Sequence, residues 1–123
     1  MRMALLSFIL LTSGALQASS HPLWKEIPAD FRGDWALRGS TCSTGPLDSG
    51  NIRITGKAII MFESRSQVKH VKIIDDSTIE VLGRTTHNKA SFGSMELLAL
   101  SADKDSLIIG PYADPDFYTR CSK

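Results

Sequence analysis

Side chains that could serve acid–base or metal chemistry are spread thinly along this 123-residue chain. Asp75 and Asp76 form an acidic pair, but no acid or base partner can be placed opposite them. The other closely spaced carboxylates fall among residue types that favour turns, and none continues into a calcium-binding loop. The three histidines have no neighbour at metal-ligand spacing: His21, His70 and His87. We therefore expect no catalytic residue, no cofactor and no metal site, and a protein that is not an enzyme.

One cluster of positive charge lies on a single expected hairpin. It consists of Arg65, Lys69, His70 and Lys72. A basic patch favours an anionic partner such as a lipid headgroup or an acidic protein. The alternative interpretation is a charged strand edge that keeps the surface soluble. The sequence leaves both open.

The first 18 residues have the pattern of a secretory signal peptide. Arg2 precedes an apolar run over residues 5–11, and small and polar residues lead up to Ala18. The apolar run is much shorter than the ~20 residues that a membrane-spanning helix needs. We expect an exported protein, periplasmic or secreted, with no transmembrane segment once the signal is removed.

The charge of the remaining chain is balanced. Removal of Arg2 with the signal peptide leaves 13 basic and 13 acidic residues. A neutral chain is a poor partner for nucleic acid, which is bound through clustered lysine and arginine. The length suffices for one domain with one core, and we expect this domain over residues 27–123. Residues 19–26, between the signal peptide and the domain, are expected to be a flexible N-terminus.

Two cysteines lie near the two ends of that domain. Cys42 ends the first expected strand and Cys121 lies near the end of the last. In an oxidising compartment, two cysteines in a small domain are most simply read as one disulfide. Neither has a Cys-x-x-Cys partner or a nearby histidine, which argues against metal binding.

The rest of the domain is a series of short apolar segments separated by turn residues. The pattern predicts eight strands, over residues 35–42, 51–55, 57–63, 67–74, 78–82, 90–100, 106–110 and 117–121. A turn is expected at residues 64–66. The apolar spacing from Val68 to Val71 breaks the period of two, which indicates a β-bulge near Lys69 and His70.

Short connections favour antiparallel neighbours, and closure into a barrel would satisfy the edge strands and the disulfide together. The predicted fold is therefore all-β, an eight-stranded up-and-down antiparallel barrel. A short helical turn between Pro28 and Gly33 precedes it. A barrel of this size is filled by its own side chains or holds one small ligand. The candidates for filling are Met61, Phe62, Phe92 and Met95.

The segment Gly33-Asp34-Trp35 after a helical turn, with Arg120 on the last strand, resembles the Gly-x-Trp…Arg signature of the calycin barrels, the lipocalins and avidins. The resemblance implies that Trp35 closes one barrel end, that Arg120 packs across its indole, and that Phe31 plugs the opening. The wider segment over residues 27–35, with the final Arg-Cys, also resembles small exported proteobacterial proteins of unassigned function.

These features favour a non-catalytic binding module of the cell envelope, for a small apolar ligand or an envelope component. The alternative is a protein–protein module such as a periplasmic inhibitor of a cell-wall hydrolase. For that alternative, Ser91-Phe92-Gly93-Ser94 matches only loosely the Ser-Gly-x-x-Tyr loop of lysozyme inhibitors. A structural envelope protein without a ligand is the third hypothesis.

Overall fold

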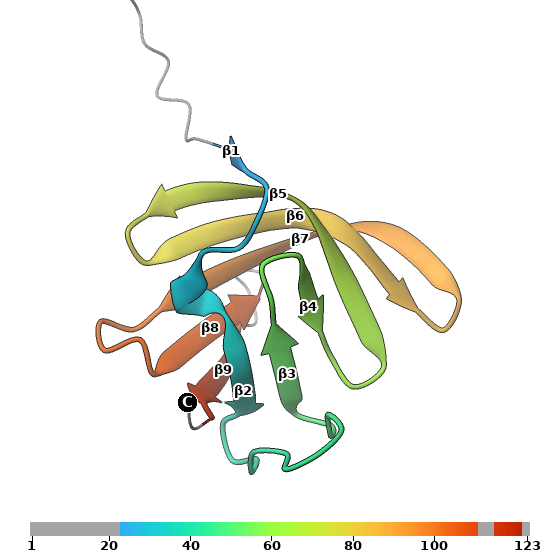
Figure 1. Ribbon diagram of the computed structural model, residues 1–123, viewed down its shortest axis with the longest axis vertical. Coiled ribbons are helices and arrows are strands. Elements are labelled where there is room, and N and C mark those ends of the chain that lie inside the picture. Colours follow the sequence, from blue (N-terminus) through green and yellow to red (C-terminus); the bar gives the residue numbers. More distant parts are fainter. Residues whose placement is uncertain (1–22, 111–114, 122–123) are drawn as a thin grey trace, which may run out of the picture.

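The computed structural model describes residues 23–110 and 115–121, which form nine strands and one 3-10 helix (Figure 1). The elements are β1 (Leu23–Trp24), η1 (Ala29–Phe31), β2 (Gly33–Leu37), β3 (Asn51–Ile54), β4 (Ala58–Ile60), β5 (Ser64–Asp75), β6 (Thr78–His87), β7 (Ala90–Leu100), β8 (Ser106–Gly110) and β9 (Asp116–Arg120). The expected signal peptide and His21 lie outside the described residues. Within the described ranges, no helix is long and apolar enough to cross a membrane.

Eight of the strands close into one antiparallel barrel. The order is β5-β4-β3-β2-β9-β8-β7-β6, and β5 pairs with β6 to complete the ring. β1 lies outside this ring and pairs with β5. The predicted eight-stranded up-and-down barrel is confirmed, as is the disulfide between Cys42 and Cys121, whose Cα atoms are 5.8 Å apart.

The first barrel strand is shorter than predicted. β2 ends at Leu37, and residues 38–50 form the connection to β3, so Cys42 lies in a loop and not on a strand. Asn51 holds this loop: its side-chain amide donates to the Thr41 carbonyl at 3.0 Å, and its Oδ1 accepts from the Ser43 N–H at 3.1 Å. A buried amide with both ends paired fixes a loop that contains few apolar residues.

The turn between β4 and β5 also differs from the prediction. The sequence placed it at residues 64–66, but Ser64 begins β5 and the turn lies just before it, where the Met61 N–H donates to the Ser64 carbonyl at 2.8 Å. Ser66 is polar and still belongs to the strand, because its hydroxyl faces inward and meets Thr85 Oγ1 at 2.7 Å. Polar residues that pair across strands do not mark turns.

The inner faces of the strands meet in one apolar core. Its members include Trp35, Ile54, Leu98 and Leu107, which are fully or almost fully buried. Of the four residues expected to fill the barrel, only Met61 packs against this core. Phe62, Phe92 and Met95 are 57%, 49% and 64% exposed. The prediction was wrong for these three because they lie in or near turns or, for Met95, on the outer face of β7.

Candidate binding groove

A groove lies where β5 changes its neighbour. The first half of β5 pairs with β4 through Gln67, and its second half pairs with β1 from Val71 onward. Between the two, the register of β5 against β6 shifts from Val68 to His70, which confirms the predicted bulge. A bulge bends a strand and increases its twist. The pairings of β4 and β1 with β5 therefore leave a gap between Gln67 and Val71, and the two strands lie on either side of it (Figure 1).

The N-terminal segment forms the second wall of this gap. Leu23 and Trp24 pair with Lys72 and Val71 of β5. Three residues after Trp24 the chain is anchored again, because the Ile27 N–H donates to the Gly56 carbonyl at 2.8 Å and the Ile27 side chain is fully buried. The segment between the two anchors bridges the gap and gives the β1–β5 groove a volume of about 890 Å³.

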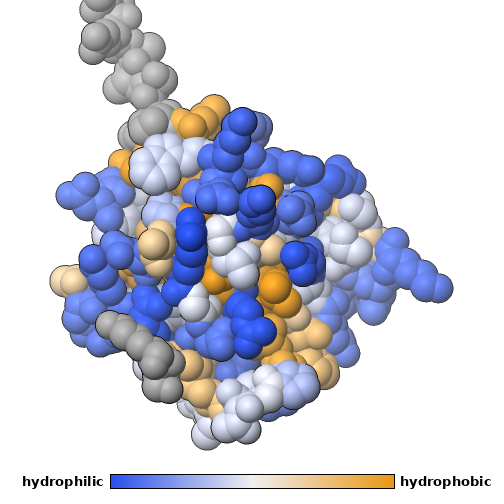
Figure 2. All heavy atoms as spheres, viewed as in Figure 1, coloured by the Kyte–Doolittle hydropathy of each residue, from blue (hydrophilic) through white to orange (hydrophobic). Residues whose placement is uncertain are grey.

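The apolar lining of the β1–β5 groove comes from both walls. It is made by Leu23, Trp24, Ile27, Pro28, Ala29 and Val68. Ile27 and Val68 are buried and form the floor, whereas Leu23 and Trp24 are 63% and 49% exposed. Figure 2 shows hydrophobic atoms at the top of the molecule, over β1. An exposed aliphatic and an exposed indole next to one hollow form a surface that an apolar group can cover.

The charged lining of the β1–β5 groove is mostly positive. Lys25, Arg32, Lys57, Lys69 and His70 line it together with one carboxylate, Glu26. With the histidine neutral, four cations and one anion give a formal charge of +3. Such a concentration of one sign attracts anions to the groove and raises the rate at which they associate.

The charge of Arg32 is engaged by neighbouring groups of the groove. Its Nε donates to the Ile27 carbonyl at 2.8 Å, and its Nη2 lies 3.7 Å from a Glu26 carboxylate oxygen. No ion pair involves Lys25, Lys57 or Lys69 among residues 23–110 and 115–121.

The basic cluster expected on one hairpin is divided by the fold. Lys69 and His70 line the β1–β5 groove. Arg65 pairs with Ile60 and Thr86 near the β4–β5 turn, beyond the groove. Lys72 lies opposite Glu80 and Leu23 and does not line the groove. The other cations of the groove are Lys25, Arg32 and Lys57, which come from outside the expected hairpin.

The residues expected to close the barrel lie together at the end that η1 covers. The Arg120 guanidinium lies 4.1 Å from the centroid of the Trp35 ring and donates to the carbonyls of Asp30 and Arg32 at 2.6 and 2.8 Å. Trp35 Nε1 donates to the Phe31 carbonyl at 3.1 Å, and Phe31 is buried. A guanidinium over an indole face adds a cation–π attraction of about 0.5–2 kcal/mol.

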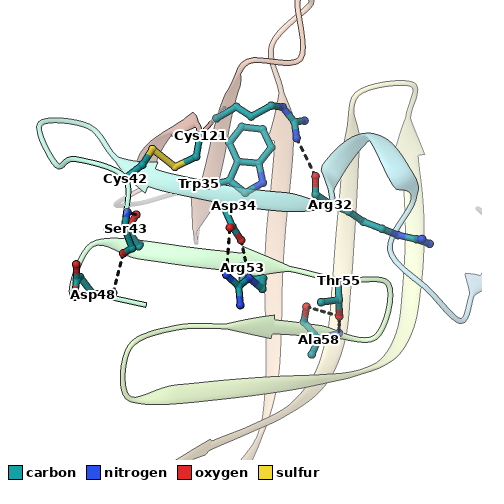
Figure 3. Close-up of polar contacts among 12 residues, drawn as sticks. Arg32, Asp34, Trp35, Cys42, Ser43, Asp48, Arg53, Thr55, Ala58 and Cys121 are labelled. Carbon is teal, nitrogen blue, oxygen red and sulfur yellow. Dashed lines mark hydrogen bonds and ion pairs between the residues drawn. A yellow bond between two sulfur atoms is a disulfide. The ribbon is translucent and has the colours of Figure 1, made fainter. Parts of the chain in front are cut away.

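The backbone around this closure requires a glycine. Gly33 has φ +127°, a conformation that side chains rarely adopt, and a Cβ there would lie 3.2 Å from an Arg120 nitrogen. Figure 3 shows the next two side chains on opposite sides of β2, with the indole of Trp35 on one side and Asp34 reaching Arg53 on the other. This end of the barrel is therefore covered by η1, which packing and hydrogen bonds hold in place.

Toward the β6–β7 turn, the inner face of the barrel becomes polar. Ser66, Thr85 and Ser94 form a hydroxyl chain, with oxygen–oxygen distances of 2.7 and 2.8 Å. Because each hydroxyl is paired with another, three polar residues are accommodated on the inner face without an unsatisfied group.

Glu96 and Tyr118 lie next on that face. Burial raises the pKa of Glu96 above its usual value, and the nearby Asp116 carboxylate raises it further. Burial likewise raises the pKa of Tyr118, with smaller contributions from Asp116 and Glu96. Both shifts stabilise the neutral forms, since a charge loses hydration inside the barrel.

The remaining candidate groups have structural roles within the described residues. Asp75 and Asp103 accept hydrogen bonds inside their turns, and these bonds lower the pKa of each carboxyl. His87 Nδ1 lies 3.0 Å from the Glu63 carbonyl. Across residues 23–110 and 115–121, no group of three His, Cys, Asp or Glu side chains is placed to hold a metal ion.

Sequence reasoning missed half of the β1–β5 groove. Leu23, Trp24 and Lys25 fall in the segment expected to be flexible, yet β1 pairs with β5 there. The bulge was visible in the spacing of Val68 and Val71, and it marks the place where a neighbouring strand is lost. No feature of the sequence of residues 23–26 indicates that they lie at that place.

Comparison of the chain with protein-family models, with characterised proteins and with solved structures gives no match. The structure supports a closed antiparallel barrel and no narrower family.

Proposed function

We propose that this protein is an exported, non-catalytic binding module of the cell envelope that holds its ligand in the β1–β5 groove. The observation that carries the proposal is the lining of that groove, where buried Ile27 and Val68 lie beneath three lysines without an ion pair in the described chain. Apolar pockets with a few convergent charged groups are the usual form of a small-molecule site.

The barrel interior is the less suitable place for a ligand. One end is covered by Trp35, Arg120 and Phe31, and the inner faces meet in a continuous apolar core. Eight-stranded barrels are narrow enough for their own side chains to fill them. A ligand-binding role therefore falls to the outer surface.

A role as a hydrolase inhibitor has less support. The segment Ser91-Phe92-Gly93-Ser94 lies within β7 and pairs in register with β6. Inhibitory and binding segments are usually loops that project from a rigid scaffold. A paired strand does not provide that shape.

Native mass spectrometry of the mature protein isolated from its own cells tests the proposal. We expect a discrete added mass that is lost in the Lys57→Glu/Lys69→Glu double variant, because both lysines line the groove. The matched control is Arg65→Glu, which reverses an exposed charge on the same β5 strand outside the groove.

The control should keep the added mass. An added mass that survives in the double variant would place the ligand elsewhere and refute the groove. A bare mass in the unaltered protein would refute a small-molecule ligand.

A further inference from the structure

The two sides of the β1–β5 groove differ in the side chains that line them. The Val68 N–H donates to the Lys57 carbonyl at 2.8 Å, so Lys57 lies beside the bulge and close to Lys69. This is the β4 side of the groove. On the β1 side lie Leu23 and Trp24, whose side chains are largely exposed. Lys57 and Lys69 thus lie toward the β4 side, whereas two exposed apolar side chains lie toward the β1 side, where Lys25 is the cation.

Buried apolar residues connect the two sides. Ile27 is fixed between them by its hydrogen bond to the Gly56 carbonyl, and Val68 precedes the bulge. Both line the groove floor. A chain lying on this floor could remain in apolar contact while its charged end stays with the lysines.

The backbone around the groove argues against a peptide as occupant. A peptide that adds a strand to a sheet needs a free strand edge. Beyond the bulge, the edge of β5 is already paired with β1 at Val71 and Lys72. Before the bulge, the same edge is paired with β4. Side-chain chemistry, and not strand addition, therefore determines what binds.

The volume also limits the ligand. About 890 Å³ falls within the range of roughly 300–1,000 Å³ that is typical of sites for small molecules. It accommodates one alkyl chain with a compact head far better than a folded partner. The positive lining requires that the head be anionic.

We propose that the β1–β5 groove binds a single-chain amphiphile with a compact anionic head, an ionised fatty acid being the simplest case. The inference rests on the proposed function and names its ligand class. The carboxylate lies between Lys57 and Lys69, and the alkyl chain runs over Ile27 toward Leu23 and Trp24. No covalent step is involved.

Trp24 supplies a direct readout. The chain has two tryptophans, and Trp35 is buried in the core, so a ligand on the groove changes the emission of Trp24. Dodecanoate at pH 8 is the probe, below the concentration at which it aggregates. Dodecyltrimethylammonium has an alkyl chain of the same length and the opposite charge, and it serves as the matched ligand control.

We expect dodecanoate to shift the Trp24 emission to shorter wavelength and to bind at least about tenfold more tightly than dodecyltrimethylammonium. The Lys57→Glu/Lys69→Glu variant should weaken dodecanoate binding by about tenfold or more, since two partly exposed charge pairs become repulsive. Arg65→Glu should remain within about twofold. Trp24→Phe should lose the spectral shift and retain binding by calorimetry.

Equal affinity for the two chains, or unchanged dodecanoate binding in the double variant, would overturn the anionic class. Stronger association with phosphatidylglycerol vesicles than with dodecanoate would also overturn it, in favour of a membrane surface. If dodecanoate does not bind while the added mass in native mass spectrometry still depends on Lys57 and Lys69, the proposed ligand class is wrong, but the groove remains the binding site. If that native mass is also missing, the proposed function itself fails.

Charge reversal at two lysines should leave the fold intact because both side chains are exposed. Thermal unfolding of each variant checks this. The milder Lys57→Gln/Lys69→Gln variant provides a second measurement, and it should give an intermediate loss of dodecanoate affinity. Unchanged affinity in this variant would overturn the role of the lysines.

Discussion

Glu96 is the carboxyl group that the barrel tolerates least in its charged form. It lies on the same face of β7 as the buried Leu98 and Leu100. Burial and the Asp116 carboxylate both raise its pKa. The folded protein therefore binds a proton at Glu96 more readily than the unfolded chain does, and stability should fall as the pH rises from about 4.5 through the raised pKa.

Replacing Glu96 by Gln should remove this loss. We expect the variant to gain stability relative to the unaltered protein as the pH rises from about 4.5 through the range in which Glu96 ionises in the folded protein, because the glutamine cannot ionise. The stability difference should become constant above that range. Urea unfolding followed by Trp35 fluorescence at several pH values measures it.

Asp75 provides a control, because its pKa is shifted in the opposite direction from the pKa of Glu96. Hydrogen bonds from the Ser77 and Thr78 region lower its pKa, so its contribution to stability is present above the unfolded value and is lost as the pH falls. The Asp75→Asn variant should therefore lose stability relative to the unaltered protein as the pH rises through the lowered pKa of Asp75 to about 3.8, below the range in which Glu96→Gln gains it. If the unfolding free energies of Glu96→Gln and of the unaltered protein changed with pH in parallel, this result would contradict the burial of Glu96.

The alternation of residues 90–100 indicated that Glu96 shares a face with Leu98 and Leu100. It did not indicate what lies opposite. Asp116 comes from β9, two strands away across β8. A pKa shift depends on such neighbours and on enclosure, and neither can be read from a single strand.

The bulge in β5 is the element that creates the groove, and it depends on a glycine in the next strand. Gly83 pairs with Val68 just before the register shift. A Cβ at Gly83 would overlap the Gln67 carbonyl oxygen. Only hydrogen fits between the two backbones at that point.

Gly83→Ala should therefore destabilise the protein by about 1–3 kcal/mol, the usual cost of overpacking, and weaken ligand binding in the groove. The loss of binding is expected because β5 must move away from β6 at Val68, which forms the floor. Denaturant unfolding and dodecanoate titration measure the two effects.

Gly93→Ala is the matched control. Gly93 lies on the adjacent strand β7, with no atom within 4 Å of a Cβ placed there. This variant should change neither stability nor binding appreciably. If Gly83→Ala changed neither stability nor dodecanoate binding, β5 and β6 would not be as close at the bulge as described here.

Strand positions could be predicted where apolar residues alternate, and the limits of β7 and β8 agree with the predicted ranges. The errors fall where the type of a residue suggests one kind of local structure and its contacts produce another. Ser64 and Ser66 look like a turn and belong to β5. The residues up to Cys42 look like the continuation of β2, but Asn51 holds them in a loop.

The whole molecule is joined across its ends by the disulfide. Cys42 and Cys121 are separated by 79 residues. By the chain-entropy model, a cross-link over such a length restricts the unfolded chain enough to contribute about 4 kcal/mol. In a domain of this size, that is a large part of a typical stability of 5–15 kcal/mol.

The Cys42→Ala/Cys121→Ala variant should lose about 4 kcal/mol of unfolding free energy while keeping the barrel, because the loop is also held by Asn51. Urea unfolding and far-ultraviolet circular dichroism measure stability and fold separately. The reduced unaltered protein should match the variant. A loss below about 1 kcal/mol in both would show that the bridge does little for stability.

The architecture of the whole molecule was predicted better from the sequence than the groove was. Eight apolar segments with short connections, and two cysteines near the ends, predicted a closed barrel, and the structure has it. The groove was less predictable because its walls come from three separate parts of the chain: residues 23–32, Lys57 and residues 67–70. Spacing within one segment carries no information about such an assembly.

The seam between β2 and β9 has a consequence for how the barrel is made. It pairs Trp35 with Arg120, so the ring closes through the strands that are made first and last. Until β9 emerges, the other strands can form only an open sheet with two unpaired edges, and such edges invite aggregation. Bringing distant strands together also carries an entropic cost that slows folding. Once oxidised, Cys42 and Cys121 keep the two sides of the seam within reach of each other, so that a barrel which opens there closes again through a local search.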